Sequence, residues 1–145
     1  MKRIVLGIVV SIIALSCDPI PWDYCGFIGN QTCDTLIISS FGEKRITSRV
    51  SPGDSLYIFG GYYQFYLDYI IPPFDKLFEI DSVLVYDLAG TELRKWVRSV
   101  PEEKGRDIFD ESEWECHDTF PQFRQVTYYS FNLTDEDIAL ERTEE

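Results

Sequence analysis

The sequence is poor in the residue types on which many enzyme and metal sites depend. Its 145 residues include one histidine, His117, and one methionine. A Ser-His-Asp triad, or a zinc site built on several histidines, cannot be assembled around one imidazole without other ligands. The neighbours Cys116 and Asp118 do not complete such a set, because adjacent side chains of an extended segment point to opposite faces. We therefore predict no catalytic residues, no metal site and no cofactor.

Positive charge is also scarce. The chain has 13 Lys and Arg against 25 Asp and Glu, which gives a net charge of −12. A surface of this sign repels phosphate backbones, and this excludes nucleic-acid binding as a function. It also offers no basic patch for anionic lipids.

The chain lacks an apolar run long enough to span a bilayer, which takes about 20 residues. Its most apolar segment, Ile4–Leu15, has 12 residues, follows two basic residues and leads into a serine and a cysteine. This order is typical of an export signal. The ending Ala14-Leu15-Ser16-Cys17 resembles a lipobox. We therefore predict that residues 1–16 are removed and that Cys17 carries the lipid that holds the protein at a membrane. Two or more acyl chains anchor stably where one does not.

Cysteines are few as well, four in the chain. If Cys17 is lipidated, Cys25, Cys33 and Cys116 remain. In an oxidising compartment three thiols indicate one disulfide and one odd thiol. Two glycines and an asparagine between Cys25 and Cys33 would let a short loop turn back on itself. We predict a Cys25–Cys33 disulfide, and the pairings that involve Cys116 stay open.

Aromatic residues are plentiful, at 15% of a chain that is 45% apolar overall. Aromatic and β-branched side chains suit a pleated sheet. A hairpin is expected around Gly60–Gly61. Alternation and turn residues predict strands at 34–40, 44–50, 55–59, 62–69, 80–88, 91–97 and 122–133, a helical turn at 107–115 and a short helix after Thr134. We predict an all-β fold, an antiparallel two-layer sandwich of the immunoglobulin-like kind, with a small barrel as the alternative.

The predicted organisation has four parts. A lipoprotein signal peptide occupies residues 1–16, and the lipidated N-terminus with its tether occupies 17–30. The β-sandwich domain follows at 31–140, and the tail at 141–145 is frayed. Prolines in the tether deny it regular hydrogen bonding.

Tyrosines are the feature with the clearest use in binding. Flat rings on a β surface stack on sugars or anchor protein partners, so we predict Tyr62, Tyr63 and Tyr66 as candidate ligand-binding residues. The acidic segment 107–118 could supply oxygen ligands to calcium, but it lacks the alternating spacing and the glycine of a calcium loop. A solvated acidic face is the favoured interpretation there.

Several segments follow one another in an order that resembles a known group. They are the signal ending in Ser16-Cys17, the turn Ser51–Asp54, the strand Ile80–Asp87, the segment Ile108–Trp114 and the closing Asp135–Ile138. The chain resembles the small uncharacterised lipoproteins that Bacteroidota export. The resemblance implies a lipid-anchored protein of a Gram-negative cell envelope, for which we expect the outer membrane, at its periplasmic face or at the cell surface. It implies no particular activity.

The same resemblance implies sites of O-glycosylation. Asp34-Thr35-Leu36 and Asp54-Ser55-Leu56 match the Asp-Ser/Thr-apolar pattern at which such bacteria modify exported proteins. Thr35 and Ser55 are therefore candidate sites. Ser82 sits in a third match, but its strand is expected to be buried. The alternative interpretation is that Asp before a hydroxyl residue simply starts a strand.

These expectations describe a cell-envelope lipoprotein whose non-catalytic β domain binds a glycan or a protein partner, or packs in an envelope assembly. The alternative is a small envelope hydrolase, for which no convergent acid, base or nucleophile set can be named. A deep cleft that holds two facing carboxylates would favour that alternative.

Overall fold

A computed structural model describes residues 20–65, 73–102, 105–121 and 124–139 of the chain. Strands make up most of this part. They are β1 (Ile20–Asn30), β2 (Leu36–Gly42), β3 (Ile46–Val50), β4 (Ser55–Phe65), β5 (Ile80–Tyr86), β6 (Glu92–Val97), β7 (Glu115–Thr119) and β8 (Gln125–Leu133). The helical segments are short: α2 (Phe74–Leu77), η1 (Glu111–Glu113) and α3 (Asp135–Ala139). No described helix is long and apolar enough to cross a membrane.

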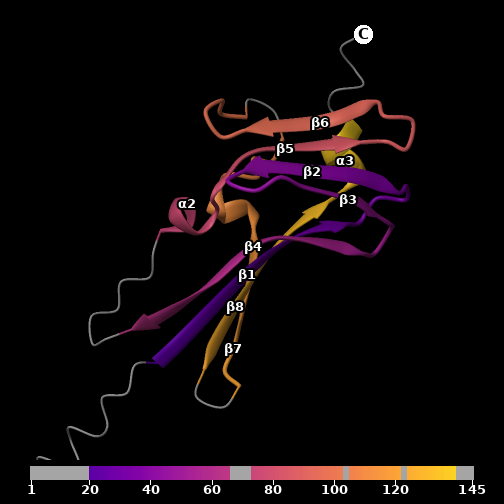
Figure 1. Cartoon of the computed structure of the whole chain (residues 1–145). Coiled ribbons are helices and arrows are strands. Elements are labelled where there is room, and N and C mark those ends of the chain that lie inside the picture. The colour runs from indigo at the N-terminus through magenta and orange to yellow at the C-terminus, as the bar shows by residue number, and fades with distance from the viewer. Residues whose placement is uncertain (1–19, 66–72, 103–104, 122–123, 140–145) are drawn as a thin grey trace, which may run out of the picture.

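The strands form two four-stranded sheets. The order β4-β1-β8-β7 makes up what is termed here the first sheet, and β3-β2-β5-β6 the second sheet. Neighbouring strands are antiparallel except for β1 and β8, which run parallel. The predicted all-β two-layer sandwich is confirmed, and two separate sheets take the place of the alternative barrel. Figure 1 shows the strands of the first sheet crossing those of the second obliquely and extending past them at one end.

That projecting end has a simple composition. It consists of the start of β1, the end of β4 and the β7–β8 hairpin, which lie together at the bottom of Figure 1. The strand register agrees, because Trp22 of β1 pairs with both Tyr63 of β4 and Gln125 of β8. It is the end of the domain nearest in sequence to Cys17.

The core lies between the two sheets and is closed at one side by α2 and by the segment before β7. Ile38, Val83 and Val85 of the second sheet have no exposed area, and neither do Ile28 and Phe131 of the first. The ring of Phe59 reaches across from β4 to aromatic rings at centroid distances of 5.0–6.2 Å; these belong to Phe74, Phe78, Trp114 and Tyr129. Burial of such rings is the main contribution to the stability of a domain of this size.

The tether prediction is wrong for residues 20–30, because these residues form a central strand. β1 pairs with β4 on one side and with β8 on the other, and its Trp22 is buried. Pro21 is tolerated there because it stands where β1 pairs only with β4, before the ladder with β8 begins at Trp22. A proline cannot donate to a ladder and is confined to such positions. The domain therefore includes Ile20 and does not begin at residue 31.

The hairpin predicted at Gly60–Gly61 is replaced by one continuous strand, β4. A side chain at Gly61 would lie 2.4 Å from the hydroxyl of Tyr24, and one at Gly26 would lie 2.0 Å from the ring of Phe59. These glycines leave room for rings that cross the strands, so they extend the sheet and do not turn it. Part of the predicted strand 62–69 falls outside the described residues.

Other sequence predictions hold. The helical turn within 107–115 is present as η1, with Ile108 and Trp114 buried on either side of it. The short C-terminal helix is present as α3, and the Asp137 carboxylate accepts hydrogen bonds from the backbone N–H and the hydroxyl of Thr134 at 2.8 and 2.9 Å. Both hydrogen bonds run from Thr134 to the Asp137 carboxylate, which therefore satisfies one free backbone donor at the start of the helix.

Candidate functional site

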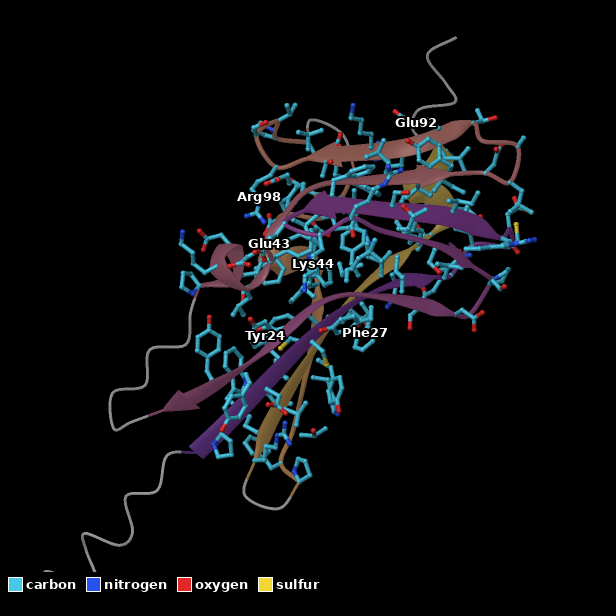
Figure 2. The ribbon with its side chains drawn as sticks, in the orientation of Figure 1. Tyr24, Phe27, Glu43, Lys44, Glu92 and Arg98 are labelled. Atoms are coloured by element: carbon cyan, nitrogen blue, oxygen red, sulfur yellow. The ribbon has the colours of Figure 1, made fainter. Side chains whose placement is uncertain are left out.

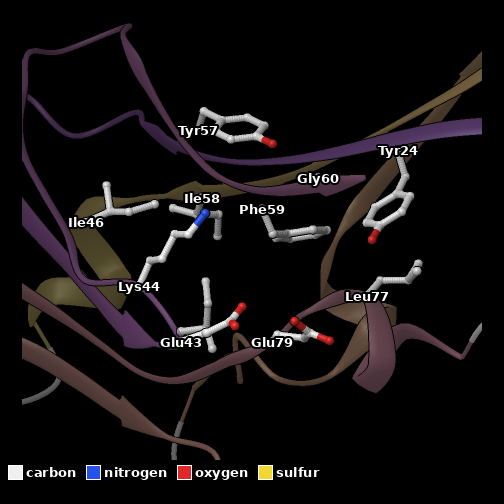
Figure 3. A pocket seen from close by; sticks show the side chains of 11 residues that line it. Tyr24, Glu43, Lys44, Ile46, Tyr57, Ile58, Phe59, Gly60, Leu77 and Glu79 are labelled. Atoms are coloured by element: carbon white, nitrogen blue, oxygen red, sulfur yellow. The ribbon is translucent and has the colours of Figure 1, made fainter. Parts of the chain in front are cut away.

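A pocket of about 240 Å³ lies at the open edge of the sandwich, where β4 faces the β2–β3 turn and the start of β5 (Figure 3). Its floor consists of the buried side chains Ile58, Phe59, Leu77 and Ile80. Its rim consists of polar and mostly exposed side chains: Tyr24, Glu43, Lys44, Tyr57 and Glu79. An apolar floor with a few converging polar groups is the usual construction of a small-molecule site. We term it the edge pocket.

The two glutamates come together because of Gly42. This residue ends β2, pairs with Ile80, and would place a Cβ 2.4 Å from the carbonyl oxygen of Glu79. Only glycine allows the two chains to approach so closely. Glu43 and Glu79 adjoin this last pair of the β2–β5 ladder, and both line the pocket. Figure 3 shows both carboxylates on the same wall, opposite Tyr57.

The opposite wall is built by β4 and β1. A Cβ at Gly60 would lie 2.5 Å from the hydroxyl of Tyr57, so the absence of a side chain there lets the Tyr57 ring lie along the edge strand. Tyr57 also makes an edge contact with Phe27 at 5.7 Å between ring centroids, and 49% of its area remains exposed. It therefore presents a ring that is held in place and open to solvent.

Tyr24 supplies a neutral hydroxyl to the pocket. Burial raises its pKa above the ordinary value, and a charge interaction and a hydrogen bond with Tyr63, together with the nearby Glu79, raise this pKa further. At neutral pH the group is protonated and can both donate and accept a hydrogen bond. Figure 2 shows Glu43 and Lys44 at the edge of the second sheet that faces Tyr24.

The geometry does not match that of a glycoside hydrolase. Such enzymes place two carboxyl groups on opposite sides of the bond that is cleaved. Here Glu43 and Glu79 extend from two paired segments of one wall, and tyrosine and apolar side chains form the other. The arrangement provides hydrogen-bond acceptors, one ammonium and an aromatic face, which is a set suited to holding a hydroxyl-rich molecule.

The predicted tyrosines lie outside the edge pocket. Tyr62 and Tyr63 are 52% and 38% exposed, and as neighbours in β4 they project from opposite faces of the first sheet. Tyr63 stacks on Trp22 and Tyr24 at 5.9 and 5.7 Å. Tyr66 falls outside the described residues. The tyrosines that line the edge pocket are Tyr24 and Tyr57, which the sequence interpretation did not select, because their convergence depends on the pairing of β1 with β4.

The Cys25–Cys33 disulfide is not formed, and the three described cysteines are free thiols. The predicted loop between Cys25 and Cys33 is instead the second half of β1, an extended segment that rises about 3.3 Å per residue and holds the two sulfurs far apart. The Cys25 sulfur lies 4.0 Å from the carbonyl oxygen of Thr127, and the Cys33 sulfur 3.8 Å from Asp135. Burial raises the pKa of both Cys25 and Cys116, and nearby carboxylates raise it further.

His117 does not converge with its neighbours. It pairs with Tyr128 in the β7–β8 ladder, while Cys116 pairs with Tyr129 and so projects from the other face. Asp118 accepts a hydrogen bond of 2.6 Å from Thr127.

The acidic segment 107–118 uses part of its charge to order its own backbone. Asp107 accepts a hydrogen bond from the N–H of Phe109, and Asp110 accepts one from the N–H of Ser112, each at 2.9 Å. Contacts with Ser112 lower the pKa of Asp110. Among the described residues no three His, Cys, Asp or Glu side chains converge on a possible metal position.

The candidate glycosylation sites differ in accessibility. Ser55 is exposed at the start of β4, whereas Thr35 is half-buried just before β2 and Ser82 is half-buried within β5. Cys17 and the signal segment fall outside the described residues.

Fold and pocket together define an all-β sandwich with a small polar-rimmed site at its edge. Comparison with protein-family models, with curated proteins and with solved structures finds no match for this chain.

Proposed function

We propose that this protein is a lipid-anchored component of a bacterial cell envelope whose β domain binds a short carbohydrate without catalysis. The edge pocket is the observation that carries the binding part of this proposal. It combines the exposed ring of Tyr57, two acceptor carboxylates and the Lys44 ammonium over an apolar floor. Aromatic faces stack on sugar rings, and carboxylates accept hydrogen bonds from sugar hydroxyls.

The size of the pocket limits the ligand. Its 240 Å³ is below the range of about 300–1,000 Å³ that is typical of sites for drug-sized molecules. One sugar ring, or the terminal ring of a longer glycan, suits this volume. Because the rim contains two carboxylates and one ammonium, we expect neutral or amino sugars to bind better than acidic ones.

The test is a glycan-array screen of the domain from Asp18 onward, which retains every described strand. A hit should weaken about tenfold, or by about 1.4 kcal/mol, on the change Tyr57→Ala. Tyr128→Ala is the matched control, because Tyr128 is 40% exposed on β8 and does not line the pocket. Binding that is unchanged by Tyr57→Ala, or lost equally in both variants, would contradict the assignment of the edge pocket.

The same domain also serves to distinguish a protein partner, and the hydrolase alternative, from carbohydrate binding without catalysis. Pull-down of an envelope protein whose binding survives removal of glycans would favour a protein partner. Turnover of a chromogenic glycoside that disappears in Glu43→Gln and Glu79→Gln would identify an enzyme and overturn the non-catalytic proposal.

The anchor is proposed from the lipobox at Cys17 and from the resemblance to exported Bacteroidota lipoproteins. Cys17→Ala should release the protein from membranes of the native cell, because the acidic chain has no basic patch that would retain it. Retention of that variant in the membrane fraction would defeat the proposal. We also propose Ser55, and less favourably the half-buried Thr35, as sites of O-glycosylation, to be checked by the intact mass of protein from its native cell.

A further inference from the structure

The projecting end of the first sheet carries aromatic side chains that the edge pocket does not use. Phe120, at the β7–β8 turn, is 71% exposed, and Tyr62 and Tyr63 near the end of β4 are 52% and 38% exposed. The register places Tyr62 and Tyr63 opposite Asp23 and Trp22, close to the start of β1. We term this region, with Pro21 and Arg124, the β1 end.

Single exposed apolar residues are ordinary, but their grouping here is not. Three of the seven large apolar side chains that are most exposed in the described part of the chain lie at the β1 end. Tyr62 and Tyr63 project from opposite faces of β4, and Phe120 lies at the tip of the neighbouring hairpin. A flat partner that meets the sheet end-on would therefore contact rings on both faces and at the tip.

The described part of the β1 end carries no unpaired charge, although the protein as a whole is acidic. Among its described residues the two charged side chains, Asp23 and Arg124, form an ion pair with each other. After removal of the signal the chain has 11 basic against 25 acidic residues, a net charge of −14. A region without net charge can approach an anionic or zwitterionic surface without the repulsion that the rest of the domain would experience.

The length of chain between the anchor and the sheet decides which surface this end meets. Three residue steps separate Cys17 from Ile20, the first residue of β1, and a fully extended chain covers about 11 Å in three steps. If the lipid at Cys17 lies in a bilayer, the start of β1 lies within that distance of the headgroups. The opposite end of the sheet, some 30 Å away along an 11-residue strand, cannot reach them.

We propose that the β1 end rests on the lipid bilayer, with Phe120, Tyr62 and Tyr63 in the headgroup interface. The inference depends on the lipid anchor of the proposed function and adds an orientation to it. Tyrosine favours this layer because its ring is apolar and its hydroxyl stays hydrated. The edge pocket lies farther along the sheet, beside the second sheet, and therefore stays in the aqueous phase.

The experiment uses the acylated full chain in vesicles of phosphatidylethanolamine and phosphatidylglycerol with brominated acyl chains. Phe120→Trp adds a reporter at the β1 end, and Tyr62→Trp is a second reporter in case the first variant does not fold. Leu88→Trp is the matched control, since Leu88 is 54% exposed and lies near Cys33, beyond the far end of β1. The native tryptophans are buried at 1–6% exposure and give a constant background.

We expect the emission added at position 120 or 62 to shift to shorter wavelength and to be lost in brominated lipid, while emission added at position 88 is retained. Because the described charges of the β1 end, Asp23 and Arg124, are paired with each other, the quenching should persist at high salt. Acylated, membrane-bound protein with no quenching at 120 or 62, or with equal quenching at 88, would overturn the orientation alone. Mass spectrometry that finds Cys17 without lipid would overturn the anchor, and the orientation with it.

Discussion

A chain of hydrogen bonds crosses three strands of the first sheet and offers a quantitative test of the fold. The indole N–H of Trp22 in β1 donates to the hydroxyl of Thr127 in β8 at 2.7 Å. That hydroxyl donates in turn to the carboxylate of Asp118 in β7 at 2.6 Å. Trp22 and Thr127 are 1% and 3% exposed, whereas Asp118 is exposed to solvent.

The perturbation is Thr127→Val, which keeps the shape of the side chain and removes its oxygen. A buried donor that loses its acceptor costs about 1–3 kcal/mol, and we expect a loss of this size in the free energy of unfolding. The Asp118 carboxylate adds little to the loss, because water replaces the lost donor at an exposed group. Thr127→Ser keeps the hydroxyl and should cost only about 0.8 kcal/mol for the lost methyl group.

The assay is urea unfolding of the domain from Asp18 onward, followed by far-UV circular dichroism. A double-mutant cycle with Trp22→Phe separates the hydrogen bond from packing. When the indole N–H is absent, Thr127→Val should be nearly neutral, so we expect a coupling energy of about 1–2 kcal/mol. A coupling energy within about 0.5 kcal/mol of zero would refute the hydrogen bond and the β1–β8 register that positions it.

Three further predictions concern titration, the edge pocket and the thiols. Burial raises the pKa of Tyr129 to about 12, so the folded state holds this proton more tightly than the unfolded state. The free energy of unfolding should therefore fall as the pH rises from about 10 to 12, and Tyr129→Phe should reduce that fall in alkaline unfolding curves. Gly42→Ala should weaken carbohydrate binding about tenfold in titration calorimetry, because the added methyl group displaces Glu79. The control is Gly53→Ala, at a φ of 83° with open space around it, which should lower stability but leave binding unchanged. Iodoacetamide should label all three described cysteines without prior reduction, with the exposed Cys33 reacting first. A mass increase of only one label would contradict this and indicate that two of the cysteines form a disulfide.

The strands that could be predicted from the sequence are those whose side chains alternate. β8 is an example, because Thr127, Tyr129, Phe131 and Leu133 are buried as the alternation indicates. β5 was predicted from a different pattern, a run that is apolar on both faces and suits a central strand; it does lie between β2 and β6, with Val83 and Val85 fully buried and Leu84 half-buried. In both cases the pattern along one segment contains the information that burial requires.

β1 and the middle of β4 could not be predicted in this way. Their glycines suggest turns, and Pro21 suggests a tether, when each segment is considered alone. The structure shows that Gly26 and Gly61 make room for the rings of Phe59 and Tyr24, which come from the partner strand. The reason for each glycine therefore lies in a residue more than thirty positions away, and no local pattern contains it.

The edge pocket was missed for the same reason. Glu43 and Glu79 are 36 positions apart and meet only because Gly42 pairs with Ile80. Tyr57 was one of many tyrosines in an aromatic segment, and the feature that distinguishes it is its contact with Phe27 on the neighbouring strand. A sequence supplies the residue types of such a site, but their convergence depends on strand register.

The parallel ladder between β1 and β8 joins the first strand of the domain to the last. A chain leaves the ribosome with its N-terminus first, so the side of β1 that pairs with β8 has no partner until nearly the whole polypeptide has been made. The second sheet can assemble earlier, since its hairpins β2–β3 and β5–β6 are local. Folding should therefore be limited by the slow pairing of these two distant strands, and until it occurs the side of β1 that faces β8 is an open template for pairing with other chains.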